Sequence, residues 1–105
     1  MAQSDEKDMW VVLRGIGEVL IVTVPEKWKE ATMRIEVQAS PAQTIIKSTI
    51  WSEQFPLEIL EANEEIWTAI REFQLLCLHK GLPWVKLNTR IERVGPNWTI
   101  SNEFD

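Results

Sequence analysis

Apolar residues in this chain follow helical spacing in two stretches and strand-like alternation between them. From Asp8 to Val24 they recur every three or four positions, which predicts a helix that ends at Pro25. The glycines in "RGIGE" and the β-branched run "IVTV" also fit a hairpin. We therefore predict a helix over residues 9–24 and keep a hairpin as the alternative. The apolar positions of this stripe are Met9, Val12, Leu13, Ile16, Val19 and Leu20.

The segment "KEATMRIEVQ", residues 29–38, alternates between apolar and polar residues. Ala31, Met33, Ile35 and Val37 fall on one face, which predicts a half-buried strand. A turn is expected at Ser40-Pro41-Ala42. The following segment "QTIIKSTIW" is rich in β-branched residues and predicts a second, antiparallel strand.

Helical spacing returns from Glu64 to Lys80, with Asn63 as the expected N-cap and Gly81 just past the end. The segments "WVKLNTRIE" and "NWTISNEF" then predict a hairpin that turns at Gly95-Pro96-Asn97. This order of elements predicts one α+β domain over residues 1–105, in which an antiparallel sheet of about four strands packs against two helices. The second helical stripe contains Ile66, Ile70, Phe73 and Cys77, widened by Trp67 and Leu76.

Composition narrows the class of protein. Of the 105 residues, 45% are hydrophobic and 26% are charged, which is typical of a packed globular chain. The net charge of −5 argues against nucleic-acid binding, because phosphate contacts need a basic surface. The most apolar run, Met9 to Val24, is interrupted by two charges and is shorter than the ~20 residues of a membrane span. A single cysteine and an acidic N-terminus, unlike a signal peptide, favour the cytoplasm.

The acidic residues are unevenly distributed. No basic residue occurs between Lys47 and Arg71, although five glutamates fall in that interval. They fit a solvated helix start, where carboxylates complement the helix dipole, and they also fit a docking face for a basic partner. The sequence alone favours the first interpretation. These glutamates are Glu53, Glu58, Glu61, Glu64 and Glu65.

No pattern of catalytic or metal-binding residues stands out. Cys77 and His79 lie two positions apart on a helix and do not face each other, so they make a poor nucleophile and base pair. One histidine and one cysteine cannot form a convincing transition-metal site. The glycines form no phosphate-binding loop. We predict that the chain is not an enzyme and needs no cofactor or metal.

The tryptophans are expected to serve the core first. Trp67 falls on the second helical stripe, and Trp28 should anchor the first strand against the helices. Trp84 and Trp98 begin the last two strands and could pack against each other or under a helix. Trp51, beside the acidic segment, is the tryptophan that best suits an interface, although burial is the commoner outcome.

The order of motifs resembles the YezG-like immunity (antitoxin) family. The resemblance rests on "VPEKW" after the first helix, on "EATMRIEVQA", on "IWTAIREF" and on "GLPWVKLNTRIERVGPNWTISNEFD". Members typically show a Pro-x-x-Trp, here Pro25 and Trp28, and a Pro-Trp before the last hairpin, here Pro83 and Trp84. An aromatic and acidic finish, here Phe104 and Asp105, completes the pattern, whereas the absence of tyrosine is a departure from it.

The resemblance implies a cytoplasmic immunity protein that neutralises the C-terminal domain of a polymorphic or contact-dependent inhibition toxin, very often a nuclease. Its partner would be that toxin domain, with no membrane or nucleic acid involved, and the protein would be a monomer or weak homodimer. The alternatives are a secretion chaperone or adaptor that holds an effector segment, and an enzyme that uses buried carboxylates. The expected partner-binding residues are Trp51, Glu53, Glu58, Glu61, Glu64, Glu65, Glu103 and Asp105.

Overall fold

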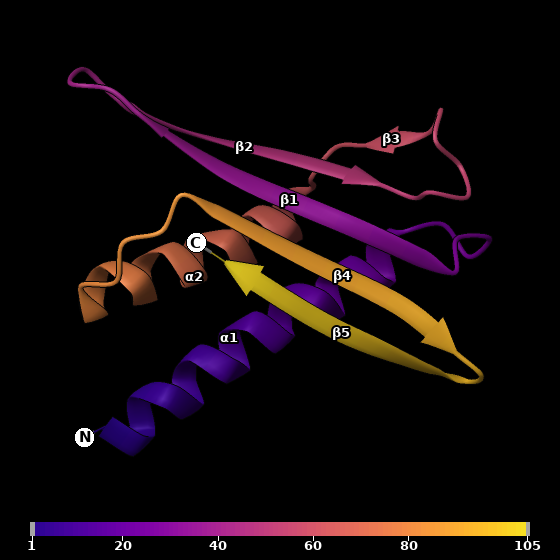
Figure 1. Cartoon of the computed structure of the whole chain (residues 1–105), viewed down its shortest axis with the longest axis horizontal. Helices are drawn as coiled ribbons and strands as arrows, with labels where there is room; N and C mark the ends of the chain where they lie inside the picture. The colour runs from indigo at the N-terminus through magenta and orange to yellow at the C-terminus, as the bar shows by residue number, and fades with distance from the viewer. Residues whose placement is uncertain (1, 105) are drawn as a thin grey trace.

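The computed structural model describes the backbone of residues 2–104 and the side chains of residues 9–38 and 40–104. The chain forms two helices and five strands (Figure 1). In chain order they are α1 (Ala2–Thr23), β1 (Glu30–Ala39), β2 (Thr44–Trp51), β3 (Ile59–Leu60), α2 (Glu64–Lys80), β4 (Lys86–Val94) and β5 (Asn97–Phe104).

The strands form one antiparallel sheet in the order β3-β2-β1-β4-β5, and Figure 1 shows both helices on the same side of it. The predicted α+β class is confirmed. The sheet has five strands where about four were expected, because β3 was not predicted. Two residues, Ile59 and Leu60, are too short a run to show alternation, and they become a strand only by pairing with Trp51 and Ile50.

The core lies between the helices and one face of the sheet. Ala31, Met33 and Ile35 of β1 are buried there, as the alternation predicted. Trp28 is also fully buried and packs where the chain enters β1. From the helices, the core receives Ile16 and Leu20 of α1 and Ile66, Ile70, Phe73 and Cys77 of α2.

Residues 9–23 are helical, which decides between the two predicted alternatives. A close contact explains one of the glycines that had favoured a hairpin. Gly17 is buried, and a Cβ placed there would overlap the side chain of Ile100 in β5. The glycine is therefore what allows α1 to lie close to the sheet. None of the helices in the described part of the chain is long and apolar enough to cross a membrane.

The limits of α2 are those predicted from the sequence. The Asn63 side chain accepts a hydrogen bond of 2.9 Å from the Ile66 backbone N–H, as an N-cap does. Gly81 adopts the left-handed conformation with φ of 67°, and its N–H bonds the carbonyls of Cys77 and Leu78.

The C-terminal hairpin differs from the prediction in where its tryptophans lie. Trp84 precedes β4, which begins at Lys86, and it packs edge-on against Phe73 of α2 with ring centroids 4.9 Å apart. Trp98 lies at the other end of the hairpin, opposite Arg93 and next to the turn. The two rings therefore do not pack against each other, and Trp84 takes the other predicted place, against a helix.

Candidate partner-binding surface

The connection from β2 to α2, residues 52–63, is held in place by its own hydrogen bonds; we call it the 52–63 loop. The backbone N–H of Phe55 donates to the Ser52 carbonyl at 3.2 Å, and that of Glu58 donates to the Phe55 carbonyl at 3.0 Å. These bonds form two successive turns before the chain pairs with β2 as β3. The loop is thus continuous with the sheet.

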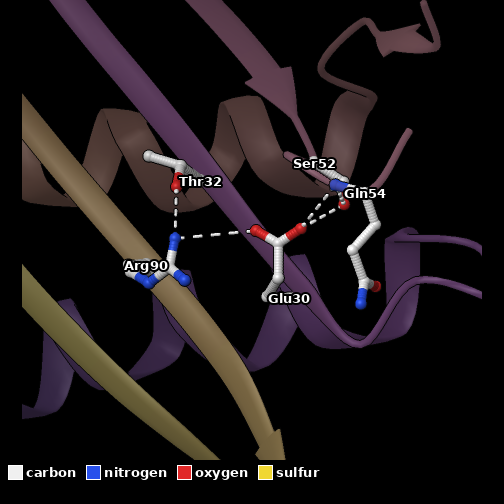
Figure 2. A network of polar contacts seen from close by, with 5 residues as sticks. All are labelled: Glu30, Thr32, Ser52, Gln54 and Arg90. Atoms are coloured by element: carbon white, nitrogen blue, oxygen red, sulfur yellow. Dashed lines mark hydrogen bonds and ion pairs between the residues drawn. The ribbon is translucent and has the colours of Figure 1, made fainter. Parts of the chain in front are cut away.

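Glu30 of β1 anchors the start of this loop. Its Oε1 atom accepts a hydrogen bond from the Ser52 hydroxyl and another, of 3.3 Å, from the Gln54 backbone N–H. Figure 2 shows the Glu30 side chain between the sheet and the loop, with Arg90 on its other side. Because Ala31 points into the core, Glu30 belongs to the sheet face that the helices leave open. It is nevertheless buried, because the loop folds over it.

Arg90 of β4 balances the charge of this buried carboxylate. Its Nη1 atom lies 3.6 Å from Glu30 Oε2 and donates to Thr32 Oγ1 at 3.4 Å (Figure 2). The Oε2 atom itself accepts no hydrogen bond among the described residues. A buried carboxylate is costly unless it is paired. The two hydrogen bonds from the loop and the nearby Arg90 guanidinium together offset the cost of burying Glu30.

Glu58 anchors the middle of the loop. Its carboxylate accepts hydrogen bonds from Lys27 Nζ at 2.6 Å and from Trp28 Nε1 at 3.0 Å. The bond from Lys27 is the larger cause, and that from Trp28 the next, of a pKa of Glu58 that lies below its ordinary value. Phe55 adds a stacked contact with Trp28, at a centroid distance of 6.4 Å. Glu58 is therefore engaged within the protein and is less available to a partner than the sequence suggested.

The anchored loop presents apolar side chains to solvent. Leu57 is 97% exposed and Ile59 is 66% exposed, although both belong to the type of residue that folding normally buries. Exposed carboxylates precede and follow them along the chain. We call this set the acidic–apolar surface: Glu53, Leu57, Ile59, Glu61, Glu64 and Glu65.

The other predicted partner-binding residues lie elsewhere. Trp51 is half-buried beneath the Arg34 guanidinium, 5.5 Å from the ring centre, and pairs with Ile59 at the border of the acidic–apolar surface. Glu103 lies on β5, which is the edge of the sheet opposite β3. The structure does not bring Glu103 together with the acidic segment, and Asp105 lies outside the described residues.

The sequence did not indicate Leu57, Ile59 or Glu30 as residues of the site, and it assigned Glu58 to partner binding, whereas Glu58 is bonded to Lys27 and Trp28. Leu57 and Ile59 are of the residue types found in cores, and only their place within three residues of Pro56, outside any periodic run, could have marked them as exposed. Glu30 was assigned to the polar face of β1, and nothing in the local pattern indicates that a loop 22 residues away would cover it.

The chemically reactive side chains are separated from this surface. Cys77 is buried in the core, and burial raises the pKa of its thiol, an effect that Lys80 partly opposes. His79 is exposed in the last turn of α2. Among the side chains that the structure describes, no three of the types that bind metals lie close enough to hold an ion.

Comparison with known proteins adds no relative. No protein-family model matches this chain, and no curated protein is significantly similar to it.

Proposed function

We propose that this protein is an inhibitory binding protein whose acidic–apolar surface occupies a basic cleft on a partner protein. The observation that carries the proposal is the exposure of Leu57 on a loop that Glu30 and Glu58 hold in a defined conformation. A preorganised loop loses little conformational freedom on binding, so more of its contact energy appears as affinity.

The two kinds of side chain have separate tasks in this proposal. Leu57 and Ile59 insert into an apolar pocket, and burying a side chain of this size contributes about 1.5–3 kcal/mol. The surrounding glutamates face basic groups on the partner. Complementary charges raise the rate of encounter and exclude partners of the wrong sign. A surface of this kind recognises a folded basic domain.

The partner is proposed to be the toxic C-terminal domain of a polymorphic or contact-dependent inhibition toxin, and a nuclease in particular. Nuclease clefts are basic because they bind phosphates, which matches the acidity of the loop. The resemblance of "VPEKW" and "GLPWVKLNTRIERVGPNWTISNEFD" to the YezG-like immunity family supports the same class. In this proposal the protein acts in the cytoplasm by occlusion, and it has no catalytic residues of its own.

Affinity capture of the tagged protein from its native cells, followed by mass spectrometry, tests the proposal. We expect a stoichiometric, folded, basic toxin domain to be retained. The recovered domain should degrade nucleic acid alone and lose that activity when one equivalent of this protein is added. Retention of an unfolded secreted effector, or of a toxin whose activity is unaffected, would contradict the proposal.

A further inference from the structure

The strand β5 is one edge of the sheet, and its outer side carries backbone groups free to pair. Its hairpin has a two-residue loop, so the flanking Val94 and Asn97 form a hydrogen-bonded pair. Alternation then directs the N–H and C=O groups of the even-numbered residues of β5 outward. No backbone hydrogen bond to these groups is present in the described part of the chain. They belong to Trp98, Ile100, Asn102 and Phe104.

A groove of about 720 Å³ follows this edge, between β5 and α1. Its walls include Trp98 and Ile100 from the strand and Trp10 and Ile21 from the helix, with Arg14 and Glu18 beside them. Trp10 is 61% exposed. Figure 1 shows the N-terminal half of α1 extending past β5, so that this stripe of the helix is left without sheet above it.

We propose that a second copy of this chain occupies the groove, with β5 pairing antiparallel to β5 of the second copy around a two-fold axis. The two sheets then become one of ten strands. Because α1 contacts β5 and extends past it, symmetry brings the two α1 helices next to each other on the helix side of the joined sheet.

The side chains of β5 restrict how the two strands can align. Residues directly opposite each other must point to the same face of the sheet. The alignment that places Ser101 opposite Ser101 of the second copy meets this requirement. On the helix side of the sheet, it sets Trp98 opposite Phe104 of the second copy and Ile100 opposite Asn102 of the second copy. It also pairs β5 along its whole length, so each outward backbone group acquires a partner.

The charges on α1 favour a second copy over an unrelated extended peptide. Arg14 Nε donates to Glu18 Oε1 at 3.0 Å within one chain, and both side chains remain more than half exposed. Two antiparallel α1 helices centred near Gly17, the residue that contacts Ile100, place Arg14 beside Glu18 of the second copy, and the reverse. The pair is thus complementary to itself, as a two-fold interface requires.

Disulfide trapping tests the alignment. Ser101→Cys places two thiols across the axis at a non-hydrogen-bonded pair, where Cα atoms are about 4.5 Å apart. Thr99→Cys is the matched control. In this alignment Thr99 lies opposite Glu103 of the second copy, so the two introduced thiols are too far apart to form a disulfide. The native Cys77 is buried and should not compete. We expect Ser101→Cys to form a covalent dimer at least tenfold faster than Thr99→Cys, and equal rates would overturn the alignment.

Light scattering of the unmodified chain tests the dimer itself, with twice the 12.2 kDa monomer mass expected at high concentration. Glu18→Arg should raise the dissociation constant of the dimer at least tenfold. Adding Arg14→Glu to this variant should restore the dimer. A wild-type monomer at every concentration, or one that binds extended peptides along β5, would refute the proposal. The acidic–apolar surface includes no residue of this groove, so the result is independent of the proposed inhibitory function.

Discussion

The hydroxyl of Ser52 donates a hydrogen bond to the carboxylate of Glu30, and this contact fixes the loop that follows β2 to the start of β1. Ser52 is fully buried and Glu30 nearly so, which makes the contact part of the protein interior although both residues are polar. The loop keeps its conformation because a charge buried beneath it is satisfied only while the loop stays closed.

Replacing Glu30 with alanine should destabilise the protein and loosen the loop. Two hydrogen bonds to a carboxylate are lost and Arg90 loses its buried partner, which we expect to cost about 2–4 kcal/mol. Urea unfolding measures the loss, and hydrogen exchange at Gln54 should become faster. Glu92→Ala is the matched control, because Glu92 is the exposed residue directly opposite Glu30 in β4. An equal loss in both variants would contradict the anchoring role of Glu30.

Glu58 should make stability depend on pH. Its pKa is lowered in the folded protein, so its contribution is fully present above the ordinary glutamate value of about 4.3 and is lost as the pH falls through the folded pKa. The difference in unfolding free energy between wild type and Glu58→Gln should therefore be largest near neutral pH and shrink below about pH 4. Glu53→Gln, which alters an exposed carboxylate of the same loop, is the matched control. A difference in unfolding free energy that grows as the pH falls would contradict a lowered pKa of Glu58.

The two glycines of α1 should respond to alanine in opposite directions. Gly15 has no atom near the position of a Cβ, so Gly15→Ala should stabilise the helix by about 0.5–1 kcal/mol. Gly17→Ala meets the side chain of Ile100, and overpacking of this kind costs about 1–3 kcal/mol, which exceeds the gain in helix propensity. Thermal unfolding of the two variants should give shifts of opposite sign. A stabilised Gly17→Ala would show that α1 and β5 are less closely packed.

Charge reversal at the acidic residues should slow association with the proposed basic partner. Glu61, Glu64 and Glu65 are all exposed, so replacing the three with lysine should reverse the local field without removing a core contact. We expect the association rate at low salt to fall at least ~10-fold, with a smaller effect at high salt because screening weakens steering. Stopped-flow or surface binding kinetics measure it. Unchanged kinetics would place the interface elsewhere.

The elements with strong local signals could be predicted from the sequence. The helix Glu64–Lys80 carries its own cap residues, and β1 carries a clear alternation, so each is specified within its own segment. The short strand β3 is specified by its partner β2 and leaves no periodic signal of its own. The predicted strand began at Trp84, whereas β4 begins at Lys86, because contact with Phe73 of another element holds Trp84 against α2.

The acidic composition of the candidate site could be predicted from the sequence, but the contacts that hold its loop in place could not. The run of glutamates was visible as an acidic segment, but its members differ in role. Glu58 is engaged by Lys27 and Trp28, whereas Glu53 and Glu61 face solvent. Contacts between residues far apart in the chain make that distinction. The same reason hides Glu30, which the pattern assigns to an exposed face and which the loop then covers.

The most direct test of the proposed function is the affinity of the captured partner domain for the loop variant Leu57→Asp/Ile59→Asp, measured by calorimetry. The control is Leu78→Asp, which alters a residue that is also exposed but lies on α2, away from the loop. Loss of an apolar anchor at the centre of an interface costs about 2 kcal/mol or more, so we predict at least ~30-fold weaker binding for the loop variant and no change for the control. Equal affinity of the loop variant and wild type would contradict the account.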